Sequence, residues 1–188
     1  MKVIVGISGA TGAILGIRLL EGLKEAGIET HVVISPWAAA NIQLETAYTV
    51  KEVEQLADYS YAHKDLGAVI SSGSYRMDAM IVAPCSMKTL ASIRLGLSDN
   101  LIARAADVLL KERKKLVLLT RETPLSDIHL EHMLALSRMG TTIFPPVPAF
   151  YNHPQNIEDL IRHIVIRTID QLGITLPAAK RWGGMKEA

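Results

Sequence analysis

The sequence has 188 residues, 49% hydrophobic and 5% aromatic, and its 20 Lys and Arg side chains against 19 Asp and Glu give a formal net charge of +1. The length fits one core, and the near-neutral charge leaves no electrostatic footprint for nucleic acid. The single cysteine excludes an internal disulfide, the six histidines show no metal-binding spacing, and no apolar run is long enough to span a membrane. We therefore expect a cytoplasmic protein that binds no metal, and the aliphatic excess favours self-association.

Short apolar runs alternate with longer amphipathic stretches along the chain, which is typical of a parallel sheet covered on both faces. We predict strands at 3–7, 30–34, 79–83, 116–120 and 141–144, with a weaker one at 59–63. Predicted helices span 12–26, 38–45, 50–59, 87–95, 100–111, 126–139 and 157–172. This pattern predicts one α/β domain over 1–188, a Rossmann-like three-layer sandwich with a mostly parallel sheet, and a C-terminal arm at 177–188.

Ligands of such sheets bind beyond the carboxyl ends of the strands, so the loops there are the candidate sites. The first loop contains Gly9-Ala10-Thr11-Gly12 and opens a predicted helix, whose free N–H groups favour a phosphate. A dinucleotide site expects an acidic residue at the end of the second strand, but Ser35 stands there, which favours a mononucleotide. A tight turn without a ligand is the alternative.

The second loop, Pro84-Cys85-Ser86-Met87-Lys88-Thr89, follows another predicted strand. Ser86 is placed to cap the next helix, and the Lys88 ammonium can face an anion there. Cys85 is better interpreted as a small buried side chain than as a nucleophile, because no His or Asn/Asp partner is identifiable.

Two further loops carry candidate residues. Arg121 and Glu122 directly follow a predicted strand, so they form either an anion clamp beside an acid/base group or a surface ion pair. Three prolines at 145–148 stiffen the segment that presents Phe150 and Tyr151, either to a pocket or to a neighbouring copy of the chain. Arg167 lies at the border of an apolar helix face, from which it can reach an anion or extend into water.

In their order and spacing these motifs resemble the UbiX/Pad flavin prenyltransferases over nearly the whole chain, especially the bacterial members named as components of phenolic acid (hydroxyarylic acid) decarboxylases. The residues that carry the resemblance are Gly9-Ala10-Thr11-Gly12, Ser35, Leu44-Glu45-Thr46, Ser71-Ser72-Gly73-Ser74, Pro84-Cys85-Ser86-Met87-Lys88-Thr89, Arg104-Ala105-Ala106-Asp107, Leu110-Lys111-Glu112-Arg113, Arg121-Glu122-Thr123-Pro124-Leu125 and Pro145-Pro146-Val147-Pro148-Ala149-Phe150-Tyr151.

The resemblance implies transfer of a dimethylallyl group from dimethylallyl phosphate to N5 and C6 of reduced FMN, which makes prenylated FMN for a partner UbiD-type aromatic acid decarboxylase. It also implies a homo-oligomer, typically a dodecamer, with sites shared between subunits. The FMN-binding residues it implies are Gly9, Ala10, Thr11, Ser35, Ser86, Met87, Lys88, Thr89 and Arg121. For the prenyl phosphate they are Tyr151, Arg167, Lys111 and the site-closing Trp182, and for catalysis Glu122, Glu45 and Lys111.

Two other functions stay open. One is an FMN-dependent decarboxylase acting on a peptidyl or pantothenoyl cysteine, whose relatives carry a Pro-Ala-Ser-Ala-Asn-Thr-like signature. Lys88 stands in the place of that Asn, which favours prenyl transfer. The other is a non-catalytic flavin carrier, which has no evident need for Arg121, Tyr151 and Arg167.

Overall fold

The computed structural model describes residues 1–176 and 183–184. Six strands in these residues form one sheet in the order β3-β2-β1-β4-β5-β6, and every neighbouring pair is parallel. The strands are β1 (Lys2–Ile7), β2 (Glu29–Ile34), β3 (Tyr59–Tyr61), β4 (Ala79–Cys85), β5 (Lys115–Thr120) and β6 (Thr142–Ile143). The predicted α/β sheet is therefore confirmed, and all strand carboxyl ends meet at one edge.

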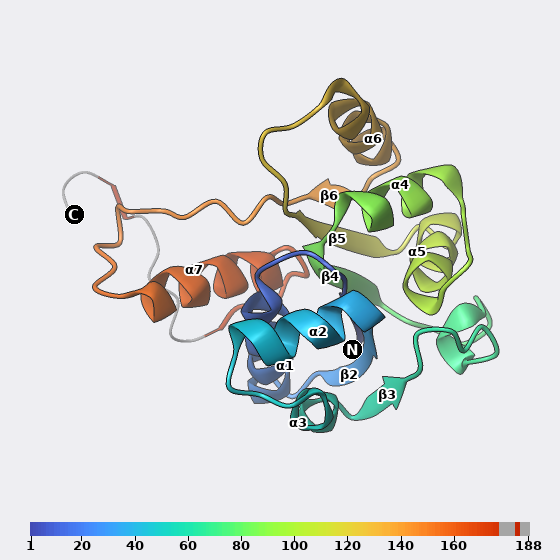
Figure 1. Ribbon diagram of the computed structural model, residues 1–188, viewed down its shortest axis with the longest axis horizontal. Coiled ribbons are helices and arrows are strands. Elements are labelled where there is room, and N and C mark those ends of the chain that lie inside the picture. Colours follow the sequence, from blue (N-terminus) through green and yellow to red (C-terminus); the bar gives the residue numbers. More distant parts are fainter. Residues whose placement is uncertain (177–182, 185–188) are drawn as a thin grey trace.

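Helices cover both faces of the sheet (Figure 1). One face carries α1 (Ala13–Glu25), α2 (Pro36–Glu45), α3 (Val50–Leu56) and α7 (Ile157–Asp170), whose buried side chains join one hydrophobic cluster. The other face carries the 3-10 helix η1 (Val69–Ser71), α4 (Met87–Leu95), α5 (Leu101–Lys111) and α6 (Asp127–Arg138) in a second cluster.

The central strands are buried on both faces because their alternate side chains enter different clusters. Val3, Val5 and Ile7 pack in the cluster of α1 and α7, whereas Ile4 packs in that of α4 and α5. A strand enclosed in this way is apolar along its whole length, which explains the continuous apolar runs of the sequence. Helix α1 lies directly on β4, since a Cβ at Gly16 would be only 2.5 Å from the Ala83 carbonyl oxygen.

The predicted element ends differ from the observed ones for local reasons. The helix predicted at 38–45 begins at Pro36, because the Ser35 Oγ accepts the Ala38 N–H at 3.1 Å and proline suits a first helical turn. The helix predicted at 50–59 ends at Leu56, because the Asp58 carboxylate accepts the Thr30 N–H at 2.8 Å and leads the chain into β3. Among the described helices, none is both long and apolar enough to cross a membrane.

Candidate functional site

Hydrogen bonds join the loops that follow β1, β2, β4 and β5 at the carboxyl edge of the sheet. The buried Ser8 hydroxyl donates to the Pro84 carbonyl at 2.9 Å and accepts the Ser86 N–H at 2.8 Å. The Ser35 N–H donates to the Ile7 carbonyl, and the Arg121 N–H to the Cys85 carbonyl, each at 3.0 Å. Ser8 was not predicted as a site residue, although a small polar residue within the glycine-rich loop was its signal.

A cavity of about 410 Å³ opens between these loops. Five of the residues predicted to bind FMN line it, and they come from three separate loops: Gly9, Ser35, Ser86, Lys88 and Thr89. The remaining lining residues are Pro36, Trp37, His63, Lys64, Ser92, Asp99 and Asn100. The structure therefore brings residues that are far apart in the sequence, such as Gly9 and Thr89, into one cavity.

The wall formed by α4 suits an anion. Ser86 is the N-cap of α4: its Oγ accepts the Thr89 N–H at 3.3 Å and donates to the Thr89 Oγ1 at 3.1 Å. Lys88 follows in the first helical turn, and Met87 is the first helical residue. A positive helix end, an ammonium and two hydroxyls together favour a phosphate.

One face of α2 holds the glycine loop. Trp37, Asn41 and Glu45 are spaced four residues apart, which places them along one side of the helix. The Asn41 amide donates to the Ala10 carbonyl at 2.8 Å, and a Cβ added at Gly9 would lie 2.5 Å from the Trp37 Cβ. Asn41 and Trp37 were not predicted, because their roles depend on how α2 packs and not on a local motif.

Glu45 changes what the glycine loop can bind. Its Oε2 accepts the Gly12 N–H at 2.8 Å and the Ala13 N–H at 3.0 Å, at the start of α1. The expectation that the free N–H groups there hold a phosphate is therefore wrong for these two donors. The Glu45 carboxylate already satisfies them, and α4 is the better anion wall.

Arg121 and Glu122 follow β5 at the same edge, and both are exposed. The Glu122 Oε1 accepts the Thr123 N–H at 3.0 Å, which holds the carboxylate beside its own loop. Cys85 is buried, and burial raises the pKa of its thiol above the ordinary range. An inert buried thiol agrees with the interpretation of Cys85 as a structural residue.

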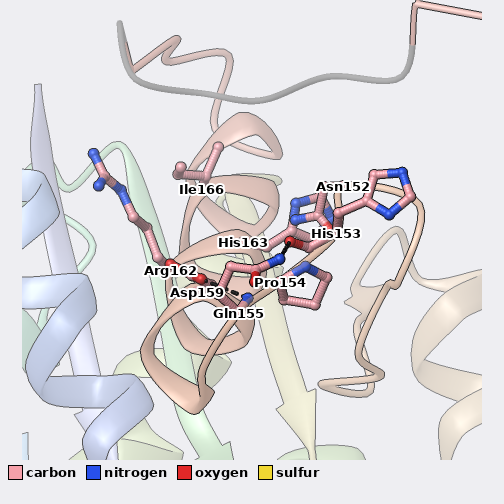
Figure 2. A pocket seen from close by; sticks show the side chains of 8 residues that line it. All are labelled: Asn152, His153, Pro154, Gln155, Asp159, Arg162, His163 and Ile166. Atoms are coloured by element: carbon pink, nitrogen blue, oxygen red, sulfur yellow. Dashed lines mark hydrogen bonds between the residues drawn. The ribbon is translucent and has the colours of Figure 1, made fainter. Parts of the chain in front are cut away.

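Tyr151 and Arg167 belong to a second region, built by α7 and the segment before it. The Tyr151 hydroxyl lies 3.3 Å from His163 Nε2, and Arg167 Nη1 lies 2.8 Å from the Asp170 carboxylate. A cavity of about 210 Å³ adjoins His163 and is also lined by Asn152, His153, Pro154, Gln155, Asp159, Arg162 and Ile166 (Figure 2). His163 gave no motif, so the sequence did not identify it.

This second region does not line the 410 Å³ cavity in the same chain. Gly12, the N-cap of α1, is at the carboxyl edge of the sheet, whereas a Cβ at Gly22 in the second half of α1 would contact Val165 and Ile169 on α7. Arg167 thus lies near the second half of α1, away from the carboxyl edge of the sheet. In Figure 1 the segment between β6 and α7 also runs away from the sheet.

Lys111 also lies away from the 410 Å³ cavity. Helix α5 starts beside it at the N-cap Asn100 and ends at Lys111, and its 11 residues span about 16 Å. Lys111 Nζ lies 2.6 Å from the Glu112 carboxylate, shortly before β5 begins at the opposite edge of the sheet. Lys111, predicted to hold the prenyl phosphate, therefore does not line the 410 Å³ cavity of its own chain. Trp182 lies outside the described residues.

Within the described part of the chain, no group of three or more His, Cys, Asp or Glu side chains is arranged to hold a metal ion. The cavity at the carboxyl edge is thus the main candidate for a cofactor. Its hydroxyls, ammonium and closely approaching glycine match the phosphate and backbone contacts that a mononucleotide needs.

Comparisons with known proteins identify the family. The Flavoprotein family matches residues 1–168. A Bacillus subtilis (strain 168) protein named "Probable UbiX-like flavin prenyltransferase" is 66% identical over 187 residues, covering 100% of this chain and 92% of that protein.

Two solved structures are similar throughout. The dodecameric FMN-dependent UbiX-like decarboxylase from Escherichia coli O157:H7 has a TM-score of 0.96 and 58% identity, covering 98% of this chain and 100% of that one. AnUbiX (PadA1), in complex with FMN and dimethylallyl pyrophosphate, has a TM-score of 0.96 and 52% identity, covering 97% of each chain.

Proposed function

Since the chain belongs to the Flavoprotein family, and within it to the UbiX-like flavin prenyltransferases, we propose that it transfers a dimethylallyl group to FMN bound in its 410 Å³ cavity. The observation that carries this proposal is the convergence of five predicted FMN-binding residues on that cavity. Its volume lies within the range of small-molecule sites. Neither a cysteine decarboxylase nor a flavin carrier is favoured by the relatives' names.

Different residues of the cavity contact the phosphate and the flavin ring of FMN. The hydroxyls of Ser35, Ser86 and Thr89 and the Lys88 ammonium bind the phosphate at the start of α4. The backbone of Gly9, Ala10 and Thr11 approaches the flavin closely, and Met87 and Arg121 complete the contacts. When bound and reduced, FMN supplies the nucleophilic N5 and C6 that take up the dimethylallyl group.

The prenyl donor is dimethylallyl phosphate, and its leaving phosphate gains negative charge as the allylic C–O bond breaks. Tyr151, Arg167 and Lys111 hold this phosphate, because a hydrogen-bond donor and two cations stabilise that charge. We assign the closing of the site to Trp182, which lies outside the described residues. Positioning the donor beside the bound acceptor supplies a large part of the acceleration.

The two sets of residues come together between copies of the chain. In one chain Lys111, Tyr151 and Arg167 do not line the flavin cavity, so we place them in the site of a neighbouring copy within a homo-oligomer. The similar E. coli protein is described as dodecameric, which supports a dodecamer here. The exposed apolar side chains of Val147 and Phe150, on the segment before α7, suit such contacts.

Two carboxylates have different tasks. Glu122 is exposed beyond β5, next to Arg121, and moves the proton that the reaction releases. Glu45 binds the Gly12 and Ala13 N–H groups, so it fixes the glycine loop against the flavin.

The product, prenylated FMN, serves a UbiD-type aromatic acid decarboxylase. The protein acts in the cytoplasm as a single flavoprotein domain.

The test mixes the purified protein with reduced FMN and dimethylallyl phosphate under anaerobic conditions and looks for a flavin adduct by mass spectrometry. A parallel sample receives dimethylallyl pyrophosphate, the ligand of AnUbiX, and a third receives a peptide with a C-terminal cysteine. We expect a prenylated flavin with the monophosphate and an unchanged peptide. Unmodified flavin from folded, FMN-loaded protein contradicts the proposal, and a decarboxylated peptide supports the cysteine decarboxylase instead.

A further inference from the structure

In the proposed function, Tyr151 and Arg167 hold the prenyl phosphate. His163 lies between these two residues in the chain, on α7. Its Nε2 is 3.3 Å from the Tyr151 hydroxyl, and the two rings meet edge to face with centroids 5.6 Å apart and an interplanar angle of 86°. Arg167 follows four residues later on α7, so it lies one turn further along the same side of the helix. His163 is only 8% exposed, whereas Tyr151 is 41% exposed.

We propose that His163 is a positioning residue, which orients the Tyr151 hydroxyl toward the phosphate of the prenyl donor. This inference rests on the proposed function, because it assigns a partner to a residue of that site. His163 itself touches neither the donor nor the flavin. It acts only through Tyr151.

The chemistry follows from the state of the imidazole. Burial lowers the pKa of His163, and the positive charge of Arg167 lowers it further, while Asp170 opposes both. The ring is therefore neutral near pH 7. In the tautomer with the proton on Nε2, it donates to the Tyr151 oxygen. The phenol proton can then be donated to a phosphate oxygen.

The residues around His163 limit the movement of its imidazole ring. Figure 2 shows His163 on the side of α7 that faces the segment carrying Asn152 and His153, while Arg162 points away from it. The preceding loop is held in turn, because the Asp159 carboxylate accepts the Gln155 N–H at 2.8 Å and the Gln155 amide donates to the His153 carbonyl at 2.8 Å. Tyr151 thus contacts α7 through His163, and the loop that follows it is held against the start of α7.

Binding of dimethylallyl phosphate to protein loaded with oxidised FMN tests the proposal, because no transfer takes place and the dissociation constant is read by calorimetry. His163→Phe keeps a ring and removes the nitrogen, and we expect it to weaken donor binding up to roughly tenfold, as for one lost hydrogen bond between neutral groups. His163→Gln restores a donor at similar reach and should recover most of the affinity. His153→Asn, an exposed neighbour in the same cavity, is the matched control.

The double variant Tyr151→Phe with His163→Phe decides the mechanism. If His163 acts through the hydroxyl, the double variant binds the donor no more weakly than Tyr151→Phe alone. Additive losses, or equal weakening of FMN binding in His163→Phe, overturn the proposal. If His163→Phe does not fold, an affinity for His163→Gln as low as that of Tyr151→Phe overturns it equally. Wild-type protein that binds the donor but forms no adduct with reduced FMN contradicts the proposed function, and the binding cycle still decides the role of His163.

Discussion

At the scale of single residues, Glu122 offers the clearest test of chemistry. Glu122→Gln keeps the size and the hydrogen-bond contact to Thr123 but removes the base, so FMN binding should stay unchanged. Adduct formation should slow roughly 100-fold, the lower end of the usual contribution of a general acid or base. Single-turnover mass spectrometry on FMN-loaded protein measures it. Glu131→Gln, on the exposed side of α6, is the control, and unchanged kinetics in Glu122→Gln would remove Glu122 from this role.

The sequence indicated which residues at the strand ends belong to the site, but it indicated their contacts only in part. Ser86 caps α4, as its place before a predicted helix indicated, whereas Ser35 caps α2 in addition to lining the cavity. The role of Glu45 could not be derived from physics alone. Its contact with Gly12 joins residues 33 positions apart and depends on the path of the whole of α2.

At the scale of secondary-structure elements, Gly16 controls how closely α1 lies on the sheet. A Cβ at this position would meet the Ala83 carbonyl oxygen at 2.5 Å and the Ile7 side chain at 2.9 Å, and the backbone of β4 cannot move without disturbing its neighbours. Gly16→Ala should lower the free energy of unfolding by about 1–3 kcal/mol, despite the better helix propensity of alanine.

Urea unfolding measures this loss. Gly67→Ala is the matched control, because a Cβ there would meet only the Asp65 carboxylate at 3.4 Å, in a loop. A Gly16→Ala variant as stable as the control would show that α1 shifts away from β4 without cost.

Most elements could be predicted because the central strands are enclosed on both faces and therefore apolar throughout. The ends of the helices and strands could not be predicted, since they depend on single contacts such as that of Asp58 with Thr30. The helix η1 gave no signal because three residues are too few to show a period. The edge strand β3 was the weakest of the predicted strands, because its residues are mostly exposed and lack the apolar run.

At the scale of the whole molecule, two buried histidines and one half-buried histidine affect the dependence of stability on pH. Burial is the main cause that lowers the pKa of His31, His63 and His163. Hydrogen bonding to Glu29 opposes this for His31, which stacks on Tyr59 with centroids 4.7 Å apart, but burial outweighs it. Unfolding returns each pKa to about 6.5, so below that pH the unfolded chain binds more protons.

The free energy of unfolding should therefore keep its full value above about pH 6.5. It should fall as the pH decreases toward the lowered pKa values of the folded state. Urea unfolding at pH 7.5 and at pH 5.5, at one protein concentration, checks this. His31→Gln should reduce the difference between the two pH values, because one titrating group is removed. Equal or greater stability of the wild-type protein at pH 5.5 would contradict the expectation.

Shared sites can be tested by mixing two defective variants. Glu122→Gln damages the cavity side and Arg167→Ala the donor side, so neither alone should form adduct at the normal rate. If each site combines two copies of the chain, co-assembly of the two variants restores some intact sites and part of the activity. Mixing the variants without subunit exchange is the control. No recovery after confirmed co-assembly would show that one chain supplies both halves.

The residues proposed to come together between copies could be predicted only in part from one sequence. Lys88 could be placed in the flavin cavity because it follows a strand end and opens a helix. Lys111, at the other end of its helix, and Arg167, beside the second half of α1, lie far from that edge. Physical argument from one sequence does not specify which surface of a second copy they meet.

The central position of β1 also affects how the protein is made. Val3 pairs with Thr30 on one side and with Ala79 on the other, so its second neighbour is 76 residues downstream. At a synthesis rate of about 5–20 residues per second, roughly 4–15 s pass before the ribosome has added that neighbour. During this interval the elements made before β4, chiefly α1, β2, α2 and α3, are available to cover a strand that is buried from Val3 to Ile7. The nascent chain thus depends on early docking of α1, or on a chaperone, to avoid aggregation before β4 emerges.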